Sequence, residues 1–506
     1  MSNALLDRTQ PATAESFDRA YANRAMILLA LMVVVTLYIE AMLTPSLPVI
    51  QSQFGVTTAQ VSLVLALYLV SGTALAPVVG KLADIYGKKK VLVYVLGIYA
   101  AAVTVTGFSP TFEFMLAART VQGIGLATMP LAMTLVREEF PRDMVPKAQG
   151  ILSAMFGVGA AVALPLGALI SQYFGWRATY HTAIPFVLAL VILLAWQIRE
   201  SRYRRPDAKV DYFGAAGLGA SLAFLVLGLS LGQIWGWTAL GTLALLGVGG
   251  ALLLPVALFE RRTKEAILNF RLLSQRNVLV SNLLVFVGGG FAIFLAMFTL
   301  TYRLEYGFGW NILDTGVGFL PLMAGLTIFG VTTGILVSRT GVRPITLLGG
   351  GIGTVGFLTA AFSSTPAQLL TSEFVIGSGM AMMLGAVTNL LVLTVDPRDL
   401  GLGTSLNSVF RTMGSSVATP VAGTMLTLWT VAGNPYLPTQ QAYEYVFLLG
   451  AVLFFGAALI VLFAHEVLGK NARPTNFDMA PSAPTAPLAA PIAETRASSV
   501  AARRGG

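Results

Sequence analysis

Fourteen apolar segments, each about 20 residues long or longer, follow one another along this 506-residue chain. A helix needs about 20 consecutive apolar residues to cross the hydrocarbon core of a bilayer. Only 11% of the residues are charged and 56% are hydrophobic, whereas about a quarter of a typical soluble domain is charged. The pattern therefore predicts an all-α polytopic membrane protein. The predicted spans are 25–50, 58–80, 91–109, 112–136, 147–171, 178–198, 212–234, 239–259, 278–301, 313–337, 344–363, 366–394, 403–430 and 442–465.

Composition also excludes several kinds of chemistry. The chain has no Cys and two His, which rules out disulfides, thiol catalysis and metal sites rich in Cys or His. The sequence holds no clustered catalytic set and no Gly-x4-Gly-Lys-Ser/Thr loop for nucleotide phosphates. We therefore expect neither an enzyme nor a bound cofactor or metal.

The basic residues lie on one side of the predicted spans. Of the 32 Lys and Arg residues, 28 fall in the termini and in alternate loops, only Arg177 and Arg303 fall on the other side, and Arg119 and Arg411 fall inside spans. Because Lys and Arg favour the cytoplasmic side, both termini are predicted to be cytoplasmic. The absence of a transit-like N-terminus favours a plasma (inner) membrane. The same placement explains the net charge of +9 without any nucleic-acid partner. The polar N-terminus predicts no removable signal peptide.

The chain repeats itself at an offset of 254 residues. Three short patterns recur at that offset: residues 80–87 at 334–341, 123–127 at 377–381, and 152–156 at 406–410. Predicted spans 1–6 therefore correspond to spans 9–14, and spans 7 and 8 are an insertion. Two repeated six-helix bundles with substrate bound between them are typical of one class of secondary transporter.

The repeat divides the chain into five parts. We predict a cytoplasmic N-terminal segment over 1–24, a six-helix bundle over 25–198, a linker with two extra transmembrane helices over 199–277, a second six-helix bundle related by a pseudo-two-fold axis over 278–466, and a cytoplasmic tail over 467–506. The tail is rich in Pro, Ala and Ser and is predicted to be disordered, because it cannot bury a core.

Residues 80–90, between predicted spans 2 and 3, are expected to form a short loop at the membrane surface. Gly80 would let two helices approach closely, and Gly87 would permit a tight turn. Asp84 is expected to accept hydrogen bonds from a helix N-terminus or to pair with a nearby Arg. Lys88 would hold the loop in the cytoplasm. Arg137, at the end of span 4, is expected to join a charge cluster near Asp84 that latches a closed state, the alternative being an ordinary solvated helix end.

This loop closely resembles the loop signature of the major facilitator superfamily. Arg119-x-x-Gln122-Gly123 resembles a motif of that superfamily's fourth helix, and Leu47-Pro48, Trp176-Arg177, Asp211 and Glu260 match further family positions. The architecture resembles the fourteen-span drug:proton antiporter branch. The resemblance implies a monomeric, proton-coupled exporter of amphipathic drug-like small molecules, cationic or neutral, that works by alternating access.

Two departures from the branch pattern leave antiport or symport open. Leu164 replaces the Gly that the fifth-helix antiporter motif places before Pro165, and Ile39 occupies a first-helix position where the branch often has Asp, with Glu40 beside it. The alternative function is a proton-coupled transporter of a dedicated lipid, siderophore or metabolite.

Charges inside the membrane are the candidate coupling residues, because each costs roughly 2.5–3.5 kcal/mol on insertion scales. Glu40 and Arg119 lie at similar predicted depths in spans 1 and 4, and we expect them to pair or to share a polar network. Competition between a proton, the substrate and Arg119 for the Glu40 carboxylate would couple proton movement to substrate movement. The alternative is that Glu40 and Arg119 form a fixed buried pair that only holds two helices together. Glu373 occupies the repeat position of Arg119 and is a third candidate.

Further polar residues within predicted spans are candidates for the wall of a substrate cavity. Arg411 would bind an anionic substrate group there or pair with a carboxylate. The full set is Tyr38, Tyr68, Gln122, Asn282, Asn389, Asn407 and Arg411.

Overall fold

The computed structural model describes residues 19–141, 144–201, 211–261, 270–395, 400–432 and 434–465, and these are almost entirely helical. Within these described residues, eleven helices are long and apolar enough to cross a membrane, which confirms the prediction of an all-α polytopic membrane protein. Three predicted spans, at 112–136, 147–171 and 403–430, are also helical but are not among the eleven. The count of fourteen spans therefore stays a prediction.

We call the helices before the inserted pair the first half. They are α1 (Arg19–Ala41), α2 (Leu47–Phe54), α3 (Thr58–Tyr86), α4 (Lys88–Gly107), α5 (Phe112–Gln122), α6 (Thr128–Glu139), α7 (Val145–Phe174) and α8 (Trp176–Gln197). A 3-10 turn, Thr44–Ser46, joins α1 to α2, and another, Gly123–Ala127, joins α5 to α6.

The second half follows the inserted helices α9 (Tyr212–Trp235) and α10 (Leu240–Glu260). Its elements are α11 (Phe270–Leu273), α12 (Arg276–Leu284), α13 (Ile293–Tyr302), α14 (Ile312–Gly318), α15 (Leu320–Thr340), α16 (Val342–Ala361), α17 (Pro366–Thr394), α18 (Leu400–Leu428), β1 (Thr430–Val431), β2 (Asn434–Pro438), α19 (Gln440–Ile460) and a final 3-10 turn, Val461–Phe463. Two π-helical stretches, Val285–Ala292 and Arg303–Gly307, flank α13.

The segment predicted as a loop over residues 80–90 is helical except at one residue. Gly87 has φ +109° and alone separates α3 from α4. Gly341, 254 residues later, has φ +98° and separates α15 from α16 in the same way. The predicted loop was too long, because only the residue with positive φ has to leave the helical conformation.

The same repeat governs how helices pack. A Cβ placed on Gly123 would lie 2.3 Å from the Tyr68 carbonyl oxygen and 2.8 Å from the Gly72 nitrogen. A Cβ on Gly377 would lie 2.2 Å from the Leu322 carbonyl oxygen and 3.2 Å from the Leu326 nitrogen. Each partner position is also displaced by 254, so both halves use one glycine for one backbone contact between helices.

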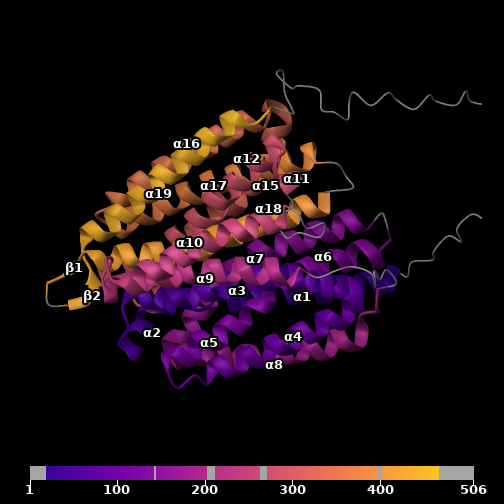
Figure 1. The fold of residues 1–506 in the computed structure, drawn as a ribbon, viewed down its shortest axis with the longest axis horizontal. Helices are drawn as coiled ribbons and strands as arrows, with labels where there is room; N and C mark the ends of the chain where they lie inside the picture. The colour runs from indigo at the N-terminus through magenta and orange to yellow at the C-terminus, as the bar shows by residue number, and fades with distance from the viewer. Residues whose placement is uncertain are drawn as a thin grey trace, which may run out of the picture.

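The two halves meet at the end of the molecule that carries α2, which we call the α2 end (Figure 1). The Tyr302 hydroxyl donates to Gln51 Oε1 at 2.6 Å, and the Tyr306 hydroxyl donates to the Pro48 carbonyl at 3.2 Å. One buried apolar cluster there combines residues of both halves, such as Leu47 of α2 and Phe298 of α13. The α2 end is therefore closed.

The β-hairpin of β1 and β2 covers this closure. Gln51 Nε2 donates to the Tyr436 carbonyl at 3.4 Å, and the Tyr436 hydroxyl donates to the Gly55 carbonyl at 3.4 Å. A hollow of about 270 Å³ remains beneath the hairpin. It is lined by Gln51, Ser52, Gly55, Tyr306, Asn434, Tyr436 and Leu437.

At the opposite end the described residues of each half pack among themselves. Leu92 and Leu135 belong to a buried cluster drawn from the first half, and Leu272 and Leu391 belong to one drawn from the second. The hydrogen bonds that join described residues of the two halves lie toward the α2 end. In the described part of the chain, the hydrogen bonds named here therefore join the two halves at the α2 end.

The inserted helix α9 lies across the boundary between the halves (Figure 1). Leu218 and Leu222 of α9 share a buried cluster with Leu63 of α3 and Val409 of α18. The Thr424 hydroxyl of α18 also donates to a carbonyl of α9, that of Leu229, at 2.9 Å. The inserted pair therefore contacts both halves rather than only linking them in sequence.

Candidate transport site

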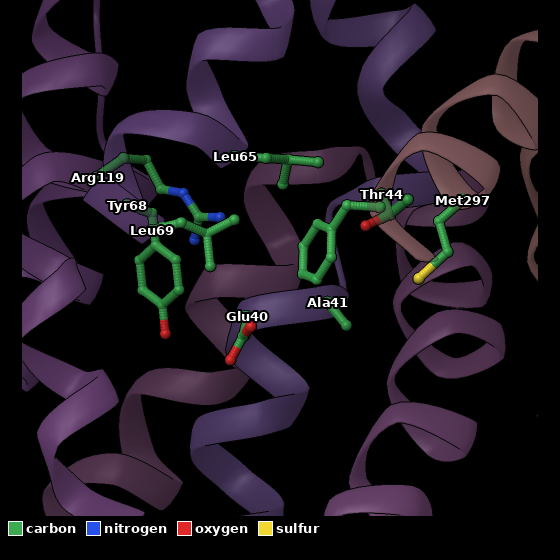
Figure 2. Close-up of a pocket in the computed structure, with 9 residues that line it drawn as sticks. Glu40, Ala41, Thr44, Leu65, Tyr68, Leu69, Arg119 and Met297 are labelled. Atoms are coloured by element: carbon green, nitrogen blue, oxygen red, sulfur yellow. The ribbon is translucent and has the colours of Figure 1, made fainter. Parts of the chain in front are cut away.

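A small cavity of about 40 Å³ lies where α1, α3, α5 and α13 meet (Figure 2). The first half supplies most of its wall, and the second half supplies two apolar side chains from α13. The lining residues are Glu40, Ala41, Thr44, Leu65, Tyr68, Leu69, Arg119, Phe294 and Met297. Glu40, Tyr68 and Arg119 are predicted site residues that the structure brings together.

Arg119 is completely buried in the wall of this cavity. Its Nε donates to the Val64 carbonyl at 3.1 Å, and its Nη1 donates to Gln122 Oε1 at 2.9 Å. Gln122 in turn donates to the Thr106 hydroxyl at 2.9 Å, and the guanidinium lies 4.8 Å from the Tyr68 ring centroid. The Arg-x-x-Gln spacing thus places both side chains on one face of α5 and fixes the guanidinium beside the cavity.

Glu40 lies half-buried near the end of α1. Figure 2 shows its carboxylate near Tyr68 and Arg119 at the same cavity. Glu40 and Arg119 both line this cavity, so a carboxylate and a guanidinium share one site. The hydrogen bonds of Arg119 go to Val64 and Gln122, so the expected link to Glu40 takes the form of a shared polar site.

Arg411 belongs to α18 of the second half and does not line the cavity. A Cβ placed on Gly290 would lie 2.1 Å from the Arg411 carbonyl oxygen, so α18 and the π-helical stretch touch backbone to backbone. Phe294, about one turn after Gly290, lines the cavity that holds Glu40. The predicted role of Arg411, in binding an anionic group or pairing with a carboxylate, therefore stays a prediction.

Glu373 does not line this cavity. It is fully buried in α17, and among the described residues neither of its carboxyl oxygens has a hydrogen-bond partner. Leu322 and Ile376 occupy the positions that correspond to Tyr68 and Gln122 in the repeat. The second half therefore also carries a charged residue at this repeat position, although of the opposite sign, but it lacks the polar neighbours that Arg119 has.

The remaining predicted cavity residues lie elsewhere. Tyr38 lies near Thr182 of α8. The side chains of Asn282 and Asn389 donate to carbonyls of their own helices, at 2.8 Å each. Asn407 donates to Ser281 Oγ at 3.4 Å and so joins α18 to α12. None of these four residues lines the cavity that holds Glu40.

Lys88 is the centre of a charge cluster at the end opposite α2. It is buried, with its Nζ 3.2 Å from Asp84 and 2.9 Å from Glu138. The partner of Asp84 here is thus a Lys rather than the expected Arg. Arg137 is exposed, and its neighbour Glu138 makes the contact.

Two residues that sequence reasoning missed complete this cluster. The Ser201 hydroxyl donates to Glu138, and the Glu200 carboxylate accepts the backbone N–H groups of Lys89 and Lys90 at 3.0 and 3.1 Å. A carboxylate at the first N–H groups of α4 is favoured by the helix dipole. The sequence offered one signal for Glu200: it is an acidic residue directly after a predicted span, close to a basic loop.

The expected close helix approach at Gly80 is not observed. A Cβ placed there would meet no atom within 4 Å, so this glycine does not bring two helices together in this conformation. A Cβ on Gly87 would lie 2.7 Å from the Glu200 carboxylate. The close approach belongs to Gly87, which also provides the turn.

Leu164 lies at a close contact between two helices. A Cβ placed on Gly316 of α14 would lie 2.8 Å from the Leu164 carbonyl oxygen and 2.3 Å from Ala168 Cβ. The glycine of α14 therefore lets its helix approach the backbone of α7. This contact joins α7 of the first half to α14 of the second.

A mostly apolar cavity that holds a carboxylate and a guanidinium, at the boundary between two halves of a bundle apolar enough to cross a membrane, is the arrangement of a secondary transporter. The family model of the Major Facilitator Superfamily matches residues 29–211 and 322–501. The chain belongs to the major facilitator superfamily, whose members are transporters rather than enzymes.

Relatives and solved structures agree with this assignment. The chain is 30% identical over 436 residues to an uncharacterized MFS-type transporter of Mycobacterium tuberculosis (strain ATCC 25618 / H37Rv), an alignment that covers 82% of this chain but only 62% of that protein. It is 26% identical over 374 residues to multidrug resistance protein 3 of Bacillus subtilis (strain 168), covering 72% of each. The fold matches the crystal structure of a bacterial homolog of the human lysosomal transporter Spinster, inward-facing and unoccupied, with a TM-score of 0.62 at 15% identity over 88% of this chain and 98% of that one.

Proposed function

We propose that this chain is a proton-coupled transporter that exports amphipathic drug-like small molecules by alternating access. In this proposal it is a monomer of the plasma membrane with fourteen spans and both termini in the cytoplasm. The observation that carries the proposal is the position of Glu40, a carboxylate at a cavity to which both halves contribute. Its similarity to multidrug resistance protein 3 supports the substrate class.

Coupling follows from competition for one carboxylate. A proton on Glu40 would remove the negative charge from the cavity that also holds the Arg119 guanidinium, and a bound substrate would change the same balance. In this proposal the basic loops are cytoplasmic. The α2 end, where hydrogen bonds join the two halves, then faces outward.

The test is substrate-driven proton movement in proteoliposomes that contain the full chain. Lumenal pH is followed while lipophilic cations such as tetraphenylphosphonium and ethidium are added. We expect a pH change with the wild type and with Glu113→Gln, which alters an exposed acid at the start of α5, but none with Glu40→Gln. A Glu40→Gln protein that still moved protons would remove Glu40 from the coupling mechanism.

The same assay separates the alternative function. If folded wild-type protein moved no protons with any amphipathic compound, a dedicated lipid, siderophore or metabolite would become the favoured substrate. Arg411 directs that second panel toward anionic compounds.

A further inference from the structure

The hollow beneath the β-hairpin is a second cavity to which both halves contribute. It has a volume of about 270 Å³ and lies between α2 of the first half, the π-helical stretch after α13, and the hairpin. It shares no lining residue with the cavity that holds Glu40. Ligand pockets in proteins typically measure about 300–1,000 Å³, so the hollow is large enough for a small molecule.

The three hydroxyl groups in the wall of this hollow donate their protons to backbone carbonyls. Ser52 and Tyr306 donate to carbonyls of α2, at 2.9 and 3.2 Å, and Tyr436 donates to the carbonyl of Gly55 at 3.4 Å. The Gln51 amide also donates to a carbonyl, that of Tyr436, at 3.4 Å. A hydroxyl group that has donated its only proton still has lone pairs to offer. The wall therefore presents chiefly hydrogen-bond acceptors to a ligand.

Two aromatic rings stand in the same wall, those of Tyr306 and Tyr436. The face of an aromatic ring attracts a cation, and cages of such rings bind quaternary ammonium groups. None of the described residues that line the hollow carries a charge, so no Lys or Arg among them repels a cation. Rings and lone pairs together favour a positively charged organic ligand.

The charged residues close to Tyr306 in the chain add to this preference. Arg303 is held within the second half, where it donates to the Ser363 carbonyl at 3.0 Å and to Gln440. Glu305 has a buried carboxyl oxygen to which no described residue donates a hydrogen bond. The acidic neighbour of Tyr306 therefore keeps a free acceptor, whereas the basic one is already engaged.

We propose that this hollow binds small organic ammonium ions and is a second ligand site of the protein. The ammonium group lies against the rings of Tyr306 and Tyr436, with the hydroxyl oxygens around it. Because the α2 end faces outward in the proposed function, an exported cation would contact this site after it leaves the cavity of Glu40. That role in export rests on the proposed function, whereas the binding of a cation does not.

Binding is tested by the protection of a cysteine in the hollow, since the chain has no Cys of its own. Ser52→Cys, at an exposed position in the wall, is alkylated with N-ethylmaleimide in nanodiscs that contain the full chain. The probes are choline, its uncharged carbon isostere dimethylbutanol, and the corresponding anion dimethylbutanoate. Ser364→Cys is an exposed position outside the hollow and serves as the control reporter.

We expect choline to slow the alkylation of Ser52→Cys in proportion to its occupancy of the hollow, and to leave Ser364→Cys unchanged. Dimethylbutanol should need about tenfold higher concentration for the same protection, the order that a desolvated cation–π contact contributes. Equal protection by choline and dimethylbutanol would overturn the proposal. Stronger protection by dimethylbutanoate, or no protection by any probe, would do so as well.

Variants of the two tyrosines locate the bound cation. Tyr306→Leu and Tyr436→Leu, each combined with Ser52→Cys, should abolish the preference for choline over dimethylbutanol. Tyr436→Phe keeps the ring and should keep the preference, as should Tyr173→Leu, which alters an exposed tyrosine at the end of α7. A preference that survived both leucine variants would overturn the proposal. If a leucine variant failed to fold, the comparison of probes on the unaltered tyrosines would still decide it.

The same reporter in a Glu40→Gln chain separates this inference from the proposed function. Protection by choline should persist there, because Glu40 does not line the hollow. Protection that disappeared would place choline in the cavity of Glu40 and overturn the second site. Persistent protection without cation-driven proton movement in the wild type would uphold the site and contradict proton-coupled export. Proton movement with equal protection by choline and dimethylbutanol would do the reverse.

Discussion

Gly87 and Gly80 belong to one sequence pattern, yet their surroundings differ. Gly87 combines φ +109° with a Glu200 carboxylate that would lie 2.7 Å from a Cβ placed on it, whereas no atom lies within 4 Å of a Cβ on Gly80. The sequence suggested a special role for both. The positive φ of Gly87 and its contact with Glu200, which lies in a distant part of the chain, distinguish the two glycines.

We therefore expect Gly87→Ala to destabilise the protein by about 1–3 kcal/mol, the usual cost of an unfavourable backbone conformation. Gly80→Ala is the matched control and should be neutral or stabilising by roughly 0.5–1 kcal/mol, since Ala favours a helix interior. Thermal unfolding in detergent measures both. Equal melting temperatures for the two variants would contradict this account of Gly87.

Lys88 gives a second prediction at this scale. Lys88→Met leaves Asp84 and Glu138 without the cation that lies within 3.2 Å of both. The loss of a buried charge partner should cost about 3 kcal/mol, and Glu138→Gln in the same chain should restore part of it. The melting temperatures of the two single variants and the double variant give the coupling energy between Lys88 and Glu138. Strictly additive effects would contradict a stabilising interaction between these two residues.

Charged site residues could be predicted from the sequence, whereas apolar ones could not. Glu40 and Arg119 stand out because a charge within a span is costly. Phe294 and Met297 line the same cavity, but in an apolar span they do not differ from residues that face lipid. Their role depends on how α13 meets α1, and no local pattern records that contact.

At the scale of helices, the repeat predicts packing as well as composition. Gly123 and Gly377 make equivalent backbone contacts, because both halves need close approach of the same helix pair. Helix positions were also predictable from apolar length. The hairpin over Thr430–Pro438 and the one-residue turns were not, because they depend on residues distant in sequence or on a single φ angle.

We expect Gly123→Ala and Gly377→Ala to lower stability and transport alike, since each new Cβ would lie within 2.4 Å of another atom. Gly351→Ala on α16 is the control, because its Cβ would meet nothing within 4 Å. Thermal unfolding and the proton assay compare the three. A mild effect of Gly377→Ala beside a severe effect of Gly123→Ala would show that the halves do not share this contact.

For the molecule as a whole, the proposed alternating access requires the α2 end to open. The hydrogen bond of Tyr302 to Gln51 and the hairpin contacts would then break. The inserted helix α9, which contacts both halves, has to follow this movement.

Proton-coupled alternating access is tested most directly by the distances between pairs of spin labels at the two ends of the molecule. The chain has no Cys, so labelled positions can be introduced without further changes. Lys90→Cys with Thr340→Cys reports the end opposite α2, and Glu113→Cys with Ser364→Cys reports the α2 end; all four positions are exposed.

Each pair is measured in nanodiscs at pH 7.5 and pH 5.5, with and without Glu40→Gln. Under the proposed coupling, acidification should change the two distances in opposite directions, because protonation removes the charge of Glu40 from a cavity that both halves line. Glu40→Gln at the higher pH should already show the distances of the acidic state. Distances that ignored both pH and the Glu40→Gln substitution would contradict the claim that this carboxylate couples protons to alternating access.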